Sequence, residues 1–305
     1  MNSEKLYKLY KESVNGITTD TRKCGPGMLF FALKGENFNG NSFAKEALKK
    51  GCIAAIVDDD TLSEIDGMVF VKDVLSAMQD LARIHRRNFD IPVLGLTGSN
   101  GKTTTKELVN AVLSKKYRVH ATKGNLNNHI GVPLTILSMS NDCEFLVVEM
   151  GANHLGEISE LVNIAEPNFG IITNIGLAHL EGFGSAEGVK KGKRELFDYL
   201  RNTSNSDGSN KKVFIHGGHP ELLEISEDME RIVFGTEENN PKVWFQEEGR
   251  GREFVWSEQG FESDRTQIQL EGDYNLDNIA AAISIGRFFG IDRKDVTSAI
   301  SNYIP

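Results

Sequence analysis

The residue types best suited to chemistry lie in one segment, Thr97-Gly98-Ser99-Asn100-Gly101-Lys102-Thr103-Thr104. An apolar run over 93–96 predicts a buried strand before it, and apolar residues over 108–113 repeat at helical spacing after it. In such a turn the glycines let backbone N–H groups approach phosphate oxygens, and the helix N-terminus adds partial positive charge. Lys102 would neutralise the β- and γ-phosphates, and Thr103 would offer its hydroxyl to Mg²⁺. The sequence therefore predicts ATP and Mg²⁺ as cofactors, with ATP bound by Gly98, Ser99, Asn100, Gly101, Lys102, Thr103 and Thr104.

The spacing departs by one residue from the common pattern Gly-x-x-x-x-Gly-Lys-[Ser/Thr]. Leu96 stands five positions before Gly101, where that pattern has glycine. An ordinary glycine turn is the alternative. We disfavour it because Gly-Lys-Thr lies between the expected strand and the expected helix.

Two further side chains follow predicted strands. Glu149 ends the apolar run 145–148, and His179 comes shortly after a second run, 169–174. Mg²⁺ prefers oxygen donors, so Glu149 beside a phosphate loop is expected to bind it; a solvent-facing glutamate is the alternative. We expect a metal or phosphate role for His179, although neutral imidazole is an uncommon Mg²⁺ ligand.

Weaker features each have a second interpretation. The basic run Lys190-Lys191-Gly192-Lys193-Arg194 is either a solvated helix face or a positive rim for a polyanionic ligand. Asn275 and Asn278 share one face of a late helix, where they either recognise the polar edge of adenine or serve as caps and surface residues. Three polar stretches are either binding loops or ordinary connections: 18–22, 34–40 and 124–133.

The elements that must position these residues form two α/β regions, and we place the boundary at Phe89-Asp90-Ile91-Pro92. The domain 1–90 is expected to contain strands over 28–33, 53–57 and 68–71 and helices over 42–50, with Ser42 as N-cap, and 74–87. In the domain 91–305, strands alternate with helices, which predicts a doubly wound, mostly parallel sheet. Its strands are expected at 93–96, 118–122, 145–149, 169–174 and 213–216.

The rest of the second domain is expected to differ in character. Short strands around 243–245, 253–256 and 267–270 predict an antiparallel addition, and 275–289 predicts a helix. The polar stretch 202–210 is expected to be a mobile surface loop.

Composition limits the classes of function. The 305 residues carry a net charge of -9, which argues against a nucleic-acid partner. The three cysteines, Cys24, Cys52 and Cys143, are widely spaced and fit a reducing cytoplasm. The sequence shows no signal peptide and no apolar stretch long enough to span a bilayer. We therefore expect a cytoplasmic protein, monomeric and without stable membrane insertion.

Several motifs together resemble one family. They include Asp20-Thr21-Arg22, Thr97-Gly98-Ser99-Asn100-Gly101-Lys102-Thr103-Thr104, Gly124-Asn125-Leu126-Asn127-Asn128, Glu149-Met150-Gly151-Ala152-Asn153-His154 and Asn174-Ile175-Gly176-Leu177-Ala178-His179. In this order they resemble the Mur ligases of peptidoglycan synthesis. The resemblance implies a small N-terminal UDP-substrate domain followed by a central ATPase domain. It also implies an ATP-dependent ligase that joins D-alanyl-D-alanine to UDP-MurNAc-tripeptide through an acyl phosphate.

The resemblance assigns roles to residues that their chemistry leaves open. It implies that Lys102, Lys193 and His179 are catalytic, that Asn275 and Asn278 lie at the adenine, and that Mg²⁺ is held by Thr103, Glu149, His179 and a carbamylated Lys193. It further implies that the UDP-linked substrate contacts Thr19, Asp20, Arg22, Lys34, Asn125, Asn127 and Asn128.

Mur ligases have a third, C-terminal domain, and this sequence ends where that domain would begin. We therefore expect a shortened form that binds the UDP-linked substrate but has little or no ligase activity alone. The alternatives are a non-catalytic nucleotide-binding module and another Mur-type ligase, of the folate or cyanophycin class. The third residue of the tripeptide, diaminopimelate or lysine, is left open.

Overall fold

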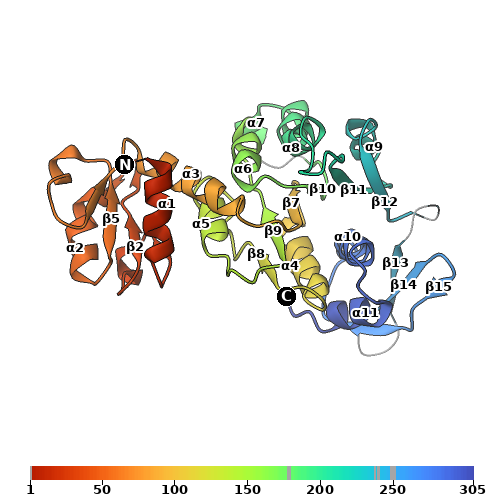
Figure 1. Cartoon of the computed structure of the whole chain (residues 1–305). Coiled ribbons are helices and arrows are strands. Elements are labelled where there is room, and N and C mark those ends of the chain that lie inside the picture. Colours follow the sequence, from red (N-terminus) through yellow and green to blue (C-terminus); the bar gives the residue numbers. More distant parts are fainter. Residues whose placement is uncertain (1, 177–179, 237, 239–240, 248–251) are drawn as a thin grey trace. The chain divides into compact units, whose positions relative to one another are not determined.

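The computed structural model describes residues 2–176, 180–236, 238, 241–247 and 252–305, and these divide into two compact units (Figure 1). Unit 1 contains Met1–Asp90 and His129–Ser140, and unit 2 contains Ile91–Asn128 and Asn141–Pro305. The chain therefore passes between the units three times. Among the described residues, no helix has the length and apolar character needed to cross a bilayer.

Unit 1 is built on a parallel sheet of four strands in the order β1-β2-β5-β6. Its strands are β1 (Ile17–Thr18), β2 (Leu29–Phe31), β5 (Ala54–Val57) and β6 (Met68–Phe70), and β3 (Lys34–Gly35) pairs with β4 (Phe38–Asn39) in a separate hairpin. β2 and β5 are buried along their whole length, which explains why the sequence shows them as continuous apolar runs. The three strands expected in this region are confirmed.

The helices of unit 1 differ in part from the expectation. They are α1 (Ser3–Glu12), α2 (Ala44–Lys49), α3 (Val74–Arg86) and α5 (Gly131–Leu137), with single 3₁₀ turns at Thr21–Lys23, Gly40–Phe43 and Asp60–Leu62. The expected N-cap Ser42 is wrong, because Asn39 caps the 3₁₀ turn that precedes α2. The helix expected between strands 118–122 and 145–149 is α5, and it packs on α3 in unit 1.

Unit 2 is built on a six-stranded parallel sheet in the order β12-β11-β10-β7-β9-β8. Its strands are β7 (Val93–Thr97), β8 (Val119–Ala121), β9 (Phe145–Glu149), β10 (Phe169–Ile172), β11 (Lys212–His216) and β12 (Glu230–Phe234). The expected parallel sheet is confirmed, and β12 extends it by a strand that the sequence reading had not named. β7 lies between β9 and β10, so successive strands are added on both sides of β7. Ligands of open α/β sheets bind at such switch points, where the direction of strand addition reverses.

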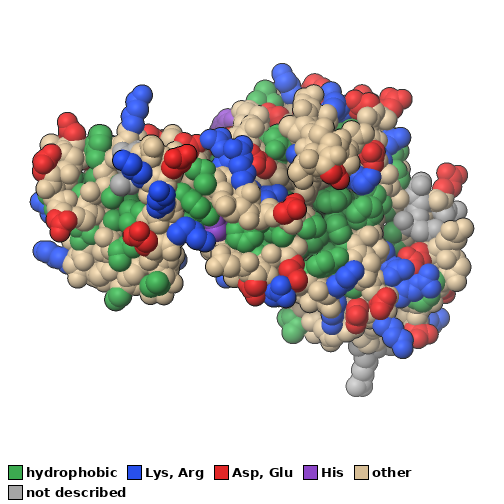
Figure 2. Space-filling view, viewed as in Figure 1, with side chains coloured by type: hydrophobic (Ala, Val, Ile, Leu, Met, Phe, Trp, Pro, Cys, Tyr) green, Lys and Arg blue, Asp and Glu red, His purple; other side chains and the backbone are tan. Residues whose placement is uncertain are grey.

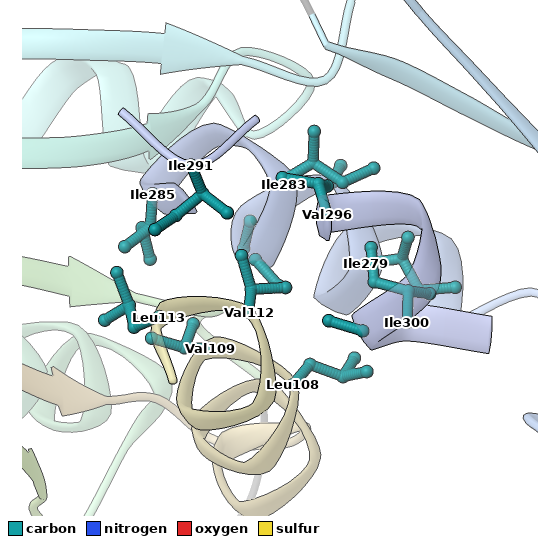
Figure 3. Packing of buried hydrophobic residues seen from close by; sticks show 14 of the residues in the cluster. Leu108, Val109, Val112, Leu113, Ile279, Ile283, Ile285, Ile291, Val296 and Ile300 are labelled. Carbon is teal, nitrogen blue, oxygen red and sulfur yellow. The ribbon is translucent and has the colours of Figure 1, made fainter. Parts of the chain in front are cut away.

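Helices cover both faces of this sheet. They are α4 (Lys102–Leu113), α6 (Glu157–Ala165), α7 (Leu180–Phe183), α8 (Ala186–Arg201), α9 (Pro220–Ile225), α10 (Asn275–Phe288) and α11 (Arg293–Ser301). α4 and α10 lie side by side, and their apolar side chains interdigitate around Leu108, Val112 and Ile279 (Figure 3). This packing brings the N-termini of two helices together although they are far apart in sequence.

α8 lies on the face of the sheet opposite α4 and α10, and it approaches β7 and β10 closely because paired glycines leave room for it. Gly95 of β7 and Gly170 of β10 are partners in register. A Cβ at Gly95 would lie 3.0 Å from Leu196 Cδ1, and one at Gly170 would lie 2.4 Å from Leu200 Cδ1. The leucines of α8 therefore fill the space that two missing side chains provide, which fixes the height of this helix above the sheet.

The expected antiparallel addition is confirmed. β14 (Arg252–Glu258) pairs with β13 (Lys242–Glu247), β15 (Phe261–Glu262) and β16 (Thr266–Ile268). The segment 202–210 is a short turn closed by a bridge between Ser204 and Asn210. On the face of the protein shown in Figure 2, acidic and basic side chains are interspersed.

Candidate nucleotide-binding site

The predicted phosphate loop connects β7 to α4. Gly98 has φ +148° and Gly101 has φ +77°, so both adopt backbone conformations that favour glycine. A Cβ at Gly98 would lie 1.9 Å from Thr173 Oγ1. Glycine at position 98 is therefore required by close approach as well as by backbone conformation.

The end of β10 holds the loop in shape. The Ser99 N–H donates to Asn174 O at 3.0 Å, and the Asn100 N–H donates to Asn174 Oδ1 at 3.0 Å. Thr173 Oγ1 donates to Asn100 O at 2.6 Å. Two loop N–H groups are thus engaged within the protein, and the N–H groups at the start of α4, up to Thr104, remain the natural anion donors.

Lys102 curls back over its own loop. Its Nζ donates to Gly98 O at 2.8 Å and to Ser99 O at 2.9 Å. Burial lowers the pKa of this ammonium group, and the nearby Glu149 opposes that shift. The charge therefore lies at the phosphate loop, where an anionic ligand would compensate its burial.

Glu149 ends β9 in a buried, polar environment. Its carboxylate accepts from Thr103 Oγ1 at 3.3 and 3.2 Å and from Asn127 Nδ2 at 2.8 Å. Its backbone N–H donates to Thr122 Oγ1 at 3.0 Å, and Lys106 Nζ lies 3.6 Å from Oε2. Neighbouring oxygen ligands of an octahedral Mg²⁺ are about 3.0 Å apart, so the hydroxyl of Thr103 and the carboxylate of Glu149 are spaced as such a pair.

Lys193 is the buried member of the basic run. It lies on α8, its Nζ donates to Ala152 O at 3.3 Å, and the nitrogen lies 5.3 Å from the centre of the Phe183 ring. Burial, with the charge of Lys102, lowers the pKa of Lys193 to about 8. The solvated-face interpretation therefore fails for Lys193, whereas Lys191 and Arg194 are exposed.

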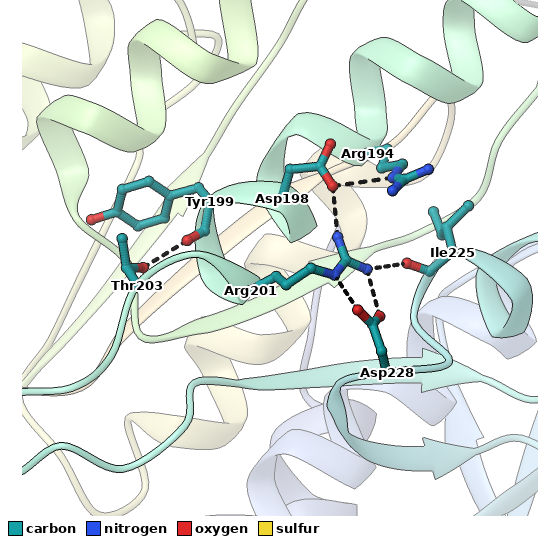
Figure 4. Close-up of polar contacts among 7 residues, drawn as sticks. All are labelled: Arg194, Asp198, Tyr199, Arg201, Thr203, Ile225 and Asp228. Carbon is teal, nitrogen blue, oxygen red and sulfur yellow. Dashed lines mark hydrogen bonds and ion pairs between the residues drawn. The ribbon is translucent and has the colours of Figure 1, made fainter.

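Both ends of α8 are anchored, which keeps Lys193 in place. Ser185 caps the N-terminus by accepting from the Gly188 N–H at 3.0 Å. At the C-terminal end, Arg201 donates to Asp228 at 2.7 and 2.8 Å and to Ile225 O at 2.8 Å (Figure 4). These contacts tie α8 to the segment that leads into β12.

Asn275 and Asn278 lie beside the phosphate loop rather than on the surface. Thr105 Oγ1 donates to Asn278 Oδ1 at 2.9 Å, and Asn278 Nδ2 donates to Asn275 Oδ1 at 2.8 Å. A Cβ at Gly101 would lie 2.5 Å from Asn278 Oδ1. The start of α10 is therefore packed directly against the start of α4, and an adenine contact by these amides stays a prediction.

The predicted substrate residues are divided between the two units. Asn127 contacts Glu149 in unit 2, and Asn125 and Asn128 are exposed in the same loop. In unit 1, Thr19 is half-buried, Arg22 donates to the Asp20 carboxylate at 2.8 and 2.9 Å, and Lys34 forms an ion pair with Asp58 at 2.9 Å. His179 lies outside the described residues.

Sequence reasoning missed three residues that complete the site. Lys106, Thr122 and Thr173 were not singled out, yet each contacts a predicted site residue or its loop. Lys106 lies one helical turn after Lys102, so helical spacing was a usable signal. The two threonines carried no such signal, because their role follows from the strand order.

Comparison with known proteins agrees with this geometry. Residues 96–286, more than half of the chain, match the Mur ligase middle domain, and residues 13–92 match the Mur ligase family, catalytic domain. The chain belongs to the Mur ligase family. It is 38% identical over 299 residues to the UDP-N-acetylmuramoyl-tripeptide–D-alanyl-D-alanine ligase of Bacillus subtilis (strain 168). That alignment covers 96% of this chain and 63% of the relative, so the chain spans less than two thirds of that ligase.

Solved Mur ligase structures have the same fold. MurF from Acinetobacter baumannii superimposes with a TM-score of 0.85 at 27% identity, covering 100% of this chain and 68% of that one. MurF ligase from Thermotoga maritima in complex with ADP gives a TM-score of 0.81 at 30% identity, covering 93% of this chain and 65% of that one. The expected fold, two α/β domains of a Mur ligase, is confirmed.

Proposed function

We propose that this chain serves the ATP-dependent joining of D-alanyl-D-alanine to UDP-MurNAc-tripeptide in peptidoglycan precursor synthesis. The γ-phosphoryl group of ATP moves to the terminal carboxylate of the tripeptide, and ADP leaves. The amine of D-alanyl-D-alanine then attacks the acyl carbon, phosphate leaves, and the nitrogen loses a proton as the amide forms. The dipeptide thus replaces a leaving group that ATP created.

One observation carries the proposal. Lys102, Thr103 and Glu149 converge at the carboxyl ends of neighbouring strands, with the buried Lys193 close enough for the charge of Lys102 to act on it. Bringing several anions together requires positioning and charge neutralisation, and this cluster offers both. Thr103 and Glu149 would hold Mg²⁺, with His179 as a further proposed ligand; the ion would supply positive charge at the phosphates.

Lys193 has a chemical state suited to carbamylation. A neutral lysine amine adds CO₂ and releases a proton, which leaves a carboxylate-like group. With its pKa lowered to about 8, a substantial share of Lys193 is neutral near pH 7.5. We propose that the carbamate forms and provides a further oxygen ligand for a divalent cation.

We assign the remaining predicted contacts in the same way. Asn275 and Asn278 would position the adenine. The domain 1–90 would bind the UDP end of the substrate through Thr19, Asp20, Arg22 and Lys34, and Asn125, Asn127 and Asn128 would contact the same substrate. We also propose a cytoplasmic location, supported by three free cysteines, and a monomeric state.

Binding to this chain is the first test. Calorimetry with ATP in Mg²⁺ and, separately, with UDP-MurNAc-tripeptide is expected to give one site for each ligand. Lys102→Met should weaken ATP binding at least tenfold and leave the binding of the UDP-linked substrate unchanged. Equal loss of both ligands, or of neither, would contradict the assignment of the phosphate loop.

Turnover is the second test. Phosphate release from ATP is measured with both substrates, on this chain and on a chimera that adds the remaining length of the Bacillus subtilis relative after Pro305. Release that depends on D-alanyl-D-alanine in the chimera supports the ligase. Binding of both ligands with no release from the chimera, while the relative itself turns over, would favour a non-catalytic nucleotide-binding module. Release with a folate or amino-acid substrate instead would favour another ligase of the family.

A further inference from the structure

Three side chains with metal-binding chemistry gather outside the site described above. His216 is the last residue of β11, His219 is the N-cap of α9, and Asp277 lies in the first turn of α10. Each offers one ligand atom, and these atoms lie within 4.8 Å of one another. Neither the phosphate loop nor Glu149 contributes to this cluster.

The donor atoms lie at distances that suit an ion as well as the direct hydrogen bond between His219 Nε2 and Asp277 Oδ2. His216 Nε2 lies 3.3 Å from Asp277 Oδ1, and His219 Nε2 lies 3.3 Å from Asp277 Oδ2. Charge-assisted hydrogen bonds are normally shorter, at about 2.7–2.9 Å. Two ligands of a tetrahedral Zn²⁺, each about 2.0–2.1 Å from the ion, are about 3.3 Å apart. Each imidazole–carboxylate distance, taken to a different carboxylate oxygen, therefore falls at the separation of two ligands around zinc.

We propose that His216, His219 and Asp277 bind a divalent transition-metal ion, best suited to Zn²⁺, with water in the fourth position. Two imidazoles and one carboxylate form a ligand set typical of zinc, whereas Mg²⁺ prefers oxygen donors alone. The proposal does not rest on the proposed ligase function, although Asp277 lies between Asn275 and Asn278, which are proposed to position the adenine. The site would join the β11–α9 turn to the start of α10, one residue before Asn278.

The surroundings support ligation. Glu221 Oε1 lies 3.5 Å from His219 Nδ1, the position of the orienting carboxylate found behind many zinc-bound histidines. The side chains of His216, His219 and Asp277 are 12%, 25% and 48% exposed, so the carboxylate leaves a path for entry.

One existing hydrogen bond must be released when the ion binds. The Gly218 N–H donates to His216 Nδ1 at 3.1 Å, which places the ring proton on the Nε2 that faces Asp277. Coordination at Nε2 moves that proton to Nδ1, so the peptide between Gly217 and Gly218 must turn away. Two consecutive glycines allow this rotation without a steric barrier from side chains.

The test is zinc titration of the chelator-treated chain by calorimetry, in a non-coordinating buffer with Mg²⁺ in excess. We expect one Zn²⁺ per chain with low-micromolar or tighter affinity from this site, and at least a tenfold loss in His219→Ala and in Asp277→Asn. The matched control is His154→Ala, because His154 is an exposed histidine only 3.1 Å from the Glu157 carboxylate and, among the described residues, belongs to no such cluster. Its zinc affinity should equal that of the unmodified chain.

A spectroscopic readout separates ligation from folding. Co²⁺ at this site should give the intense visible absorption of tetrahedral coordination, absent from His219→Ala, while circular dichroism shows that the variant is folded. The proposal is overturned if the chain binds no zinc, if His219→Ala and Asp277→Asn bind it as tightly as the original, or if His154→Ala loses it equally.

Discussion

Replacing Lys106 by methionine should destabilise unit 2 strongly, although Lys106 is outside the predicted set of ATP ligands. Its side chain is 0% exposed, and Nζ lies 3.6 Å from Glu149 Oε2, 3.0 Å from Glu107 Oε1 and 3.4 Å from Gly124 O. Methionine fills a similar volume but has no charge. The substitution therefore leaves the buried Glu149 carboxylate without the ammonium group of Lys106.

The expected loss of stability depends on which of the two glutamates paired with Lys106 is buried. Glu149 is 1% exposed and Glu107 is 38% exposed, so the longer of the two ion pairs is the one removed from water. Removing one member of a buried pair costs about 3–5 kcal/mol, whereas an exposed pair contributes about 0–1 kcal/mol. We expect about 3 kcal/mol for Lys106→Met, near the lower limit because Asn127 and Thr103 still donate to Glu149.

The assay is urea unfolding followed by tryptophan fluorescence. The chain has two tryptophans, Trp244 and Trp256, and both lie in unit 2, so the transition reports this unit. Glu107→Gln is the matched control and should lower stability by less than about 1 kcal/mol. The double variant Lys106→Met/Glu149→Gln should recover about 2 kcal/mol relative to Lys106→Met alone, because it removes the uncompensated charge.

Two results would refute this reasoning. If Glu107→Gln costs as much as Lys106→Met, contact distance rather than burial determines the energetics. If the double variant is no more stable than Lys106→Met, the lysine acts through packing and not through the charge of Glu149.

Three further predictions concern separate parts of the chain. Burial lowers the pKa of His85 in unit 1 from 6.5 to about 4, so the contribution of the neutral imidazole to stability is present above pH 6.5 and is lost as the pH falls towards 4. Urea unfolding followed by far-ultraviolet circular dichroism should show that the free energy of unfolding falls by about 2 kcal/mol over this range, and His85→Leu should not show this fall. Gly101→Ala should lower stability by more than Gly208→Ala. Both glycines have φ near +80°, but only the Cβ added at position 101 would meet another side chain, Asn278, at 2.5 Å. Equal urea midpoints for the two variants would contradict this. With ¹³C-labelled bicarbonate, NMR should show a carbamate resonance that Lys193→Met lacks and that Lys191→Met, which alters an exposed lysine of the same helix, retains.

Local pattern was enough to predict the elements that carry the site. The apolar run before Gly98 and the helical repeat after Lys102 predicted β7 and α4 correctly, because a buried strand and an amphipathic helix each impose their own period on the sequence. Alternating strands and helices likewise predicted the parallel sheet, and this placed Glu149 at the same edge as the loop. Where local rules compete, the prediction failed: Ser42 has the chemistry of an N-cap, but the 3₁₀ turn capped by Asn39 uses that position instead.

Other features depend on contacts between distant segments. From sequence, the basic run around Lys193 could be either a solvated face or a rim for an anionic ligand. Lys193 is buried because α8 packs closely on the paired glycines of two strands. Asn278 meets the phosphate loop 173 residues after Thr105 only because α4 and α10 pack together. α5 follows β8 in the chain but packs in unit 1, and His216 and His219 meet Asp277 only in three dimensions. The sequence by itself determined the local elements and the type of chemistry, since these depend on period and residue type. Tertiary structure alone decided which charges are buried and which side chains meet, because both depend on how separate elements pack.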